Sequence, residues 1–278
     1  YGELLSDLGQ ARMDMRMDLR NGKTGARYAG GLSLENFDLG VWSGNPDLGM
    51  VTFKSEVKDG VGLTLETVDA KLESVIDRFS FRGYSYENVI LDGRLNKEFF
   101  DGDLIVKDDN IDFNFSGSIR NFSTVPEFKF KAKVNHLDLQ ALKLSEQDIR
   151  ASGEIDLDLR DIRLANIQGV ASGRNIRVVR DGEREFSLDS IRVASQLLPA
   201  QLRLFRVQSD ILNGHLQGYF NIEKLPAILL HYLRDNFPQV FERLELQTPK
   251  PLLAEHQFEY QLSIPDTKNL TTLIDPGL

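Results

Sequence analysis

Alternation of apolar and polar residues is the main pattern of this chain, and it is clearest between Ile111 and Val134. In the segment IDFNFSGSI, every second position is apolar or small and the positions between are polar. After a turn at Asn121–Pro126, the segment FKFKAKV places apolar residues on one face and three lysines on the other. Because successive strand side chains point to opposite faces, this pattern predicts two half-buried antiparallel strands with one apolar and one polar surface.

The same period of two recurs along most of the chain, with glycine-rich or polar turns between the segments. Segments with this pattern include Ala11–Leu19, Val89–Leu95, Phe99–Val106, Arg150–Arg160 and Asn213–Ile222. Leu63–Thr67 is also expected to be extended. The sequence therefore predicts a mainly β protein built from many similar strands.

The period changes to that of a helix between residues 225 and 236. Leu225, Leu229 and Leu233 recur on one side of this stretch, and Pro238 is expected to end it. The segment lacks the Lys/Arg-rich polar face of a helix that lies on an anionic membrane. We therefore expect a short amphipathic helix that closes an open end of the sheet. A second short helix is expected at Thr267–Ile274.

Two similar phrases lie one hundred residues apart. Leu34, Asn36, Phe37, Asp38 and Leu39 correspond to Val134, His136, Leu137, Asp138 and Leu139. Each phrase closes a strand, which suggests that one set of strands is used more than once. We therefore predict two β modules, at residues 1–145 and 146–278, with the helix in the second and with the second continuous with the first.

Composition excludes several classes of function. The chain has 278 residues, 41% of them hydrophobic, and a formal charge of −9, so it lacks the basic surface that binds nucleic acid. Without cysteine it has neither disulfides nor thiolate sites. The longest helical apolar run, Leu225–Leu233, is too short to span a bilayer. The chain begins at Tyr1 without a signal peptide, and we expect it to be a segment of a longer protein.

Motifs for catalysis or metal binding are missing from the sequence. The four histidines are scattered, and there is no nucleophile elbow, P-loop or dinucleotide fingerprint. Met13, Met15 and Met17 share one strand face, where adaptable packing is a better interpretation than a copper site because no histidine is near them in the sequence. We therefore expect no enzyme activity, no metal and no cofactor.

A longer stretch of the chain carries a family resemblance. FRGYSYENVILDGRLNKEFFDGDLIVKDDNIDFNFSGSI, from Phe81 to Ile119, is similar to TamB-like proteins of the Bacteroidota type, within the AsmA-like group. The most specific marks are Gly-Tyr-x-Tyr-x-Asn at Gly83–Asn88, Leu-x-Gly at Leu91–Gly93 and Phe-x-Gly at Phe100–Gly102. RVQSDILNGHLQGYFNIEKL, which ends at Leu225, resembles the same group.

This resemblance implies a β-taco: a long curled antiparallel or mixed sheet that forms a repeating β-groove with an apolar interior. Such proteins are anchored in the inner membrane, cross the periplasm and engage an Omp85-type outer-membrane protein called TamA or TamL. They are implicated in phospholipid transport to the outer membrane and in outer-membrane protein assembly. The resemblance therefore implies a periplasmic segment of a lipid conduit, with its anchor outside this chain.

Apolar strand faces supply the candidate wall of such a groove. The predicted lining residues are Met13, Met15, Met17, Ile111, Phe113, Phe115, Phe128, Phe130, Val134, Ile155 and Leu157. Exposing the roughly 30 methylenes of two lipid chains would cost on the order of 25 kcal/mol, a barrier that such a wall would lower. Two alternatives remain: a β-sandwich in which a second sheet covers these residues, and a scaffold or adhesin that binds protein partners.

Overall fold

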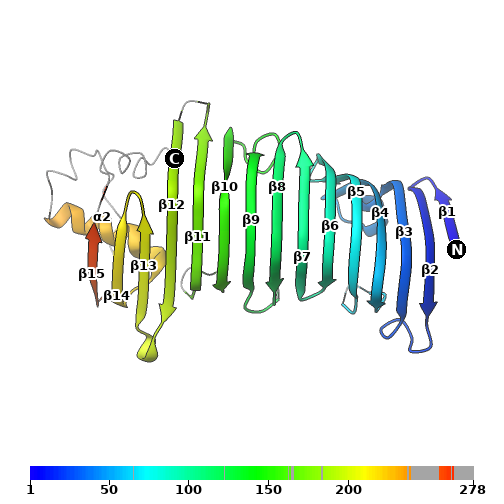
Figure 1. The fold of residues 1–278 in the computed structure, drawn as a ribbon, viewed down its shortest axis with the longest axis horizontal. Helices are drawn as coiled ribbons and strands as arrows, with labels where there is room; N and C mark the ends of the chain where they lie inside the picture. The colour runs from blue at the N-terminus through cyan, green and yellow to red at the C-terminus, as the bar shows by residue number, and fades with distance from the viewer. Residues whose placement is uncertain are drawn as a thin grey trace. The chain divides into compact units, whose positions relative to one another are not determined.

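The computed structural model contains one open sheet of fifteen strands, in which neighbouring strands follow chain order (Figure 1). It describes residues 1–64, 66–121, 123–161, 163, 166–182, 184–236, 238, 257–263 and 265. The strands whose register is resolved pair antiparallel. Consecutive antiparallel strands need only short connections, and the alternating sequence supplies these between its strands.

Most strands are ten or more residues long, and the helices are few and short. The first nine strands are β1 (Gly2–Ser6), β2 (Gly9–Asp18), β3 (Arg27–Asp38), β4 (Leu48–Val61), β5 (Asp69–Phe81), β6 (Tyr84–Asn96), β7 (Phe99–Asp108), β8 (Ile111–Arg120) and β9 (Glu127–Asp138). The last six are β10 (Ile149–Arg160), β11 (Gln168–Arg180), β12 (Arg184–Leu197), β13 (Arg203–Ser209), β14 (Asn213–Tyr219) and β15 (Gln257–Ser263). The α-helices are α1 (Leu39–Ser43) and α2 (Leu225–Asn236), and the 3₁₀ turns are η1 (Pro199–Gln201) and η2 (Ile222–Lys224).

The predicted fold class is confirmed. The chain is mainly β, its open antiparallel sheet is consistent with a β-groove, and α2 begins at Leu225 as the helical period predicts. Two local predictions are wrong. The described residues of 63–67 lie in a turn and not in a strand, since the backbone N–H groups of Thr67 and Val68 both donate to the carbonyl of Thr64. The strand predicted at Asn213–Ile222 ends at Tyr219, and Ile222 begins the turn η2. The helix expected at Thr267–Ile274 lies outside the described residues.

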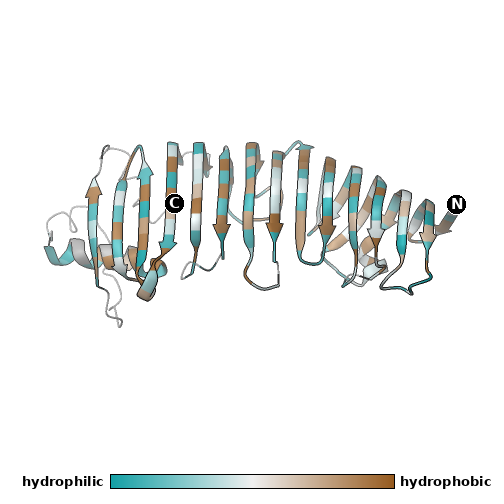
Figure 2. Ribbon diagram, turned by 60° about the horizontal axis from the view of Figure 1, so that its bottom comes forward, coloured by the Kyte–Doolittle hydropathy of each residue, from teal (hydrophilic) through white to brown (hydrophobic). Residues whose placement is uncertain are grey.

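Hydropathy alternates along the strands as the sequence pattern requires, and apolar and polar bands follow one another in Figure 2. Ion pairs between neighbouring strands join the charged positions: Arg120 pairs with Asp101 at 2.6 Å, and Lys131 with Asp156 at 3.8 Å. These side chains are exposed, so each pair contributes about 0–1 kcal/mol. The polar positions thus keep that surface solvated and do little to hold the sheet together.

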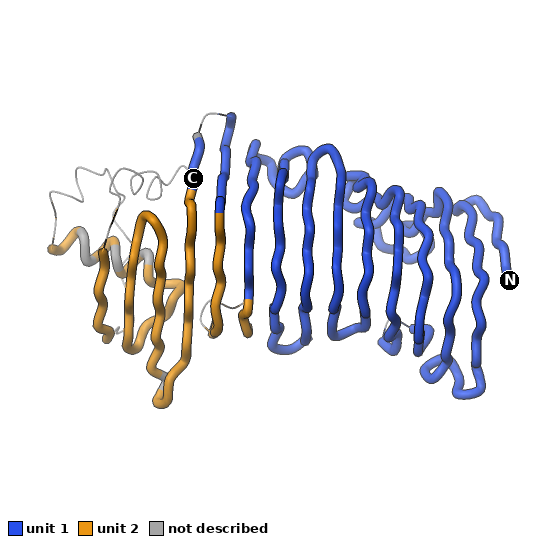
Figure 3. The backbone as a smooth tube through the Cα atoms, in the orientation of Figure 1, with its two compact units in different colours: residues 1–157, 175–187 blue, residues 158–174, 188–278 orange. Residues whose placement is uncertain are grey.

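The chain forms two compact units (Figure 3). Unit 1 contains residues 1–157 and 175–187, and unit 2 contains residues 158–174 and 188–278. Strands β1–β9 therefore lie in unit 1, and β13–β15 with α2 lie in unit 2. In unit 2, α2 runs across β13–β15 (Figure 1), and its first residue, Leu225, is buried. None of the described helices is long and apolar enough to cross a membrane.

Connections in the two halves of the chain repeat each other at a spacing of about 100 residues. Asp38 Oδ1 accepts the N–H of Val41 at 2.9 Å, and Asp138 Oδ1 accepts the N–H of Ala141 at the same distance. Each aspartate thus caps the turn that follows its strand. The backbone N–H of each also donates to a carbonyl at the start of the preceding strand, Leu8 for Asp38 and Asn110 for Asp138.

Two further connections share this spacing. The carbonyl of Thr64 accepts from Thr67 and Val68, and the carbonyl of Arg163 accepts from Asn166 and Ile167. The tight turn at residues 82 and 83 has positive φ at both positions, as has the turn at residues 181 and 182. The similarity between Asp38 and Asp138 in the sequence therefore reflects a repeated structural element, which extends from β3 to β12.

Candidate functional site

Strand pairing carries one apolar surface across unit 1 from β2 to β9. Directly paired residues of antiparallel strands project from the same face, so the register can be followed from strand to strand. We call this surface the apolar face. The central row of paired residues is Met13, Leu32, Ser55, Ser74, Leu91, Leu104, Phe115 and Ala132.

Two more rows flank the central row on this face. One, which we call the glycine row, is Met15, Gly30, Val57, Leu72, Gly93, Gly102, Gly117 and Phe130. The other is Ala11, Leu34, Phe53, Ile76, Val89, Val106, Phe113 and Val134. Apart from two serines, every residue in the three rows is apolar or glycine.

All eleven residues predicted to line a groove lie on this face. Met17 follows Met15 at strand spacing, Ile111 precedes Phe113, and Phe128 is paired with Ile119. Residues 155 and 157 are placed by the side chains next to them in the sequence. Glu154 forms an ion pair with Lys133, and Asp156 forms one with Lys131, each with an N–O distance of 3.8 Å, on the polar side of the sheet. Because side chains alternate, Ile155 and Leu157 take the apolar side.

Some large side chains on the apolar face are exposed and others are buried. Met13 is 41% exposed, Met17 44% and Ile155 36%, whereas Phe115 is 8% exposed. All described strands belong to one sheet, so no second sheet of described residues packs on this surface as a β-sandwich would require. The apolar face is therefore a surface with its own lateral packing and open apolar side chains.

Phenylalanine rings cover part of the glycine row. Gly93, Gly102 and Gly117 are paired in succession, and a Cβ placed on Gly102 would lie 2.2 Å from the carbonyl oxygen of Asp92. The ring centroid of Phe115 lies 5.8 Å from that of Phe100 and 4.8 Å from that of Phe130. Phe115 and Phe130 thus stabilise the sheet next to residues that have no side chain.

A pair of hydroxyls interrupts the central row. Ser55 Oγ and Ser74 Oγ are 2.7 Å apart, and both side chains are buried. Leu32 and Leu91 stand on either side of them in the row. Because a buried hydroxyl is costly without a partner, the mutual hydrogen bond allows two serines at small positions of an apolar surface.

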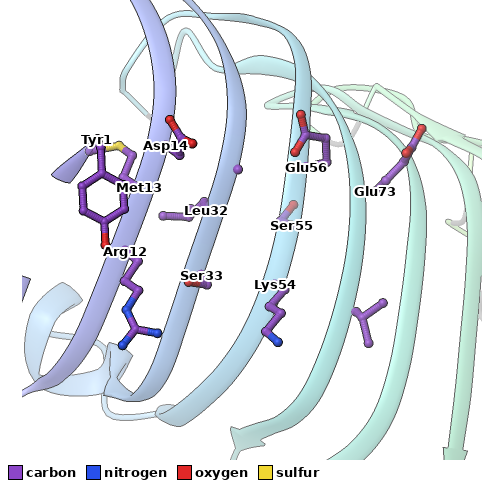
Figure 4. A pocket seen from close by; sticks show the side chains of 12 residues that line it. Tyr1, Arg12, Met13, Asp14, Leu32, Ser33, Lys54, Ser55, Glu56 and Glu73 are labelled. Atoms are coloured by element: carbon purple, nitrogen blue, oxygen red, sulfur yellow. The ribbon is translucent and has the colours of Figure 1, made fainter. Parts of the chain in front are cut away.

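A shallow hollow of about 460 Å³ lies over β2–β5, and most of the side chains that line it come from polar-face positions (Figure 4). The carboxylates of Asp14, Glu56 and Glu73 lie toward one end of it, with Arg12 and Lys54 toward the other, and Gly31 also lines it. Glu73 also pairs with Lys58 and Lys71. The hollow is thus a mixed-charge surface whose carboxylates are in part neutralised.

Asp156 of β10 and Asp161 of the following turn are both held by basic side chains. Asp156 pairs with Lys131, and Asp161 is buried and binds the guanidinium of Arg163 through both carboxylate oxygens. The hydrogen bonds from Arg163 hold the pKa of Asp161 well below its usual range. No group of three or more potential ligands from His, Cys, Asp and Glu occurs among the described residues.

Unit 2 carries a buried arginine among apolar positions. Arg203 Nη1 donates to the Ile167 carbonyl at 2.9 Å and to Ser195 Oγ at 2.8 Å. Burial lowers the pKa of Arg203. Ser195 Oγ also donates to the same carbonyl at 2.7 Å, which ties β12 and β13 to the end of the connection between β10 and β11. Sequence alternation gave no sign of this polar cluster.

The Gly83–Asn88 motif joins the ends of two neighbouring strands, β6 and β7. The Tyr84 hydroxyl donates to Asp108, and Asn110 Nδ2 donates to the Tyr84 hydroxyl at 3.1 Å. The backbone N–H of Glu87 also donates to Asp108, at 3.0 Å, and Asn88 Nδ2 donates to the Lys107 carbonyl at 3.2 Å. The motif thereby fixes the start of β6 against the end of β7.

Tyr84→Phe is expected to lower the free energy of unfolding and to make it depend less on pH in the alkaline range. Loss of the hydrogen bond to Asp108 should cost about 1–2 kcal/mol at neutral pH. Burial, helped by Asp108, raises the pKa of Tyr84 from 10 to about 12. Between these values the unfolded chain loses the phenolic proton while the folded chain keeps it, so this contribution is complete below pH 10 and is lost as pH rises to 12.

Urea unfolding of the wild type and the variant at pH 8 and pH 11 measures this difference. The gap in unfolding free energy should be smaller at pH 11. Tyr219→Phe, which alters a tyrosine that is nearly half exposed, is the matched control. An equal gap at both pH values would show that the Tyr84 proton does not contribute.

Comparisons with known proteins add no relative. No family model matches the chain, and no curated protein and no solved structure matches it.

Proposed function

We propose that this chain is a segment of a TamB-like conduit of the AsmA-like group, and that the apolar face contacts phospholipid acyl chains in transit between the inner and outer membranes. The observation that carries the proposal is the continuous, partly open apolar surface that strand register extends from Met13 to Val134. The opposite surface carries exposed ion pairs, which suits it to water.

The energetics of lipid transfer support this function. Moving two acyl chains of roughly 30 methylenes through water would cost on the order of 25 kcal/mol at about 0.8 kcal/mol per methylene. A wall of methionine, leucine and phenylalanine side chains replaces that water, and the head groups remain at the open edge. The process needs no catalytic residue, metal or cofactor from this chain.

Cellular context follows from the same proposal. The segment would lie in the periplasm, within a protein that is anchored in the inner membrane through another segment. Its partners would be phospholipid and an Omp85-type outer-membrane protein of the TamA or TamL kind, and it would support outer-membrane protein assembly. The competing function is a scaffold or adhesin whose polar face binds protein.

Site-specific photo-crosslinking in cells tests the lipid contact. A benzophenone amino acid at Phe113 should capture phospholipid, and the same group at Asn114, the next residue on the same strand, should capture much less because it projects from the opposite face. Phe130 and Lys131 form a second matched pair. Protein adducts at Asn114 and Lys131 without lipid at Phe113 or Phe130 would support the scaffold and overturn the conduit, provided that a known lipid-facing control captures lipid.

A further inference from the structure

At one end of the strands of unit 1, two long connections each contact a tight turn between other strands. We call residues 38–47 the first connector and residues 138–148 the second connector. The first ends against the β5–β6 turn, where the N–H of Arg82 donates to the Asp47 carbonyl at 2.7 Å. The second ends in the same way against the β11–β12 turn, where the N–H of Asp181 donates to the Asp148 carbonyl at 2.9 Å.

The second connector also contacts a turn on its other side. Lys143 Nζ donates to the Gly83 carbonyl at 2.6 Å, so this connector reaches past the β7–β8 turn to the β5–β6 turn. The neighbouring Leu142 is fully buried. Each side of the second connector is thus in contact with a turn whose first two residues have positive φ, Arg82 and Gly83 on one side and Asp181 and Gly182 on the other.

The first connector has the same beginning but a different environment. Trp42 and Leu142 are each the fourth residue after the capping aspartate, which places them at the same position of the turn. Leu142 is 0% exposed, whereas Trp42 is 67% exposed and its neighbour Val41 is 68% exposed. The ring of Trp42 contacts that of Phe37 edge-on, with 6.4 Å between the ring centroids, and most of the Trp42 surface remains open.

The helix that presents this tryptophan is firmly held. Asp38 caps its start, Gly44 ends it in the left-handed conformation, and a Cβ on Gly40 would lie 2.3 Å from the Leu48 carbonyl oxygen. A large apolar side chain on a fixed one-turn helix is a ready contact surface.

We propose that Val41 and Trp42 form a docking surface for a β-hairpin turn of the same type as Arg82–Gly83, supplied by two further strands that pair ahead of β1. The first connector then contacts a turn on both sides, as the second connector does. This docking surface is independent of lipid binding, because it lies on the connectors and involves none of the residues proposed to contact acyl chains.

The chain itself supplies the hairpin for a direct test. The β1–β2 turn corresponds to the β7–β8 turn, since Leu8 and Asn110 accept equivalent backbone hydrogen bonds. A copy of residues 69–103 is therefore fused in place of Tyr1, directly ahead of Gly2. Trp42 is the only tryptophan of the chain, and the copied segment adds none, so its fluorescence reports the docking surface alone.

Docking should shift the Trp42 emission to shorter wavelength and lower its quenching by iodide several-fold. The unextended variant Trp42→Phe with Leu142→Trp gives the reference values for a covered position. A fused segment with the same residues in scrambled order should leave Trp42 as accessible as before. Protection of the copied strands from hydrogen exchange with an unchanged Trp42 would overturn the proposal.

Two further measurements keep the test decisive if the extended chain does not fold. Leu142→Ala in the existing chain should speed hydrogen exchange of the Gly83 and Tyr84 amides several-fold, and unchanged exchange would remove the basis of the proposal. Phosphatidylcholine vesicles added to the existing chain should leave the Trp42 emission unchanged. A shift to shorter wavelength with vesicles would assign the surface to a membrane and overturn the hairpin.

Discussion

Phe115→Ala is expected to lower the free energy of unfolding of unit 1 by about 3 kcal/mol, because it removes a buried ring and leaves a cavity beside the glycine row. Phe115 is 8% exposed, and its ring lies between those of Phe100 and Phe130. The estimate is at the lower end for such replacements, since neighbouring side chains on an open face can move to fill part of the space.

Urea unfolding followed by circular dichroism measures this change, and hydrogen exchange of the β7–β9 amides locates it. Met17→Ala is the matched control on the same face, because Met17 is 44% exposed and its loss should cost less than about 1 kcal/mol. A Phe115→Ala variant as stable as Met17→Ala would show that this ring does not support the sheet. Phe115→Leu, which keeps most of the apolar volume, should lie between the two.

Local pattern predicts most of the strands, the helix α2 and the apolar side of the strands that alternate. Alternation depends only on neighbouring residues, and the helical period that predicts α2 is local as well. Leu63–Thr67 was predicted incorrectly because its threonines favour strands in general, while here Thr64 and Thr67 hydrogen-bond to each other in a turn. Propensity is overridden where side chains bond locally.

Local alternation could not predict that the apolar face is continuous from strand to strand. Met13 and Phe115 belong to the same row only through six intervening pairings, and register is a property of pairs of strands. Alternation alone predicts that Leu32, Leu104 and Val106 lie on the apolar side of their own strands. Only the pairings between strands place them on one continuous face. The burial of Phe115 and the exposure of Met17 depend on neighbours that the sequence does not identify.

The role of the glycine row also depends on strand pairing and could not be predicted from one strand at a time. Gly93 and Gly102 belong to the phrases of the sequence that carry the family resemblance, but their physical role is visible only once Gly102 is paired with Gly93 and Gly117. At this place the backbones of β6, β7 and β8 leave no room for side chains on the apolar face. A glycine here is required by a close approach between strands and not by a turn.

Gly102→Ala is therefore expected to destabilise unit 1 by about 1–3 kcal/mol, the usual cost of forcing an extra methyl group into a packed site. Its Cβ would lie 2.2 Å from the Asp92 carbonyl oxygen and 2.4 Å from Gly93 Cα, both backbone atoms that move only if β6 and β7 separate. Hydrogen exchange of the β6 and β7 amides should rise in the variant, and urea unfolding should show the lower stability.

Gly31→Ala is a closely matched control, because Gly31 also lies inside a long strand but a Cβ there meets only Glu56 Oε2, at 3.7 Å. Alanine reduces the conformational freedom of the unfolded chain, so this variant should be unchanged or more stable by about 0.4–1 kcal/mol. The two substitutions add the same methyl group to strand glycines, and they differ only in the space that the sheet leaves for it. Equal stability of the two variants would show that β6 and β7 are not held as closely as the glycine row requires.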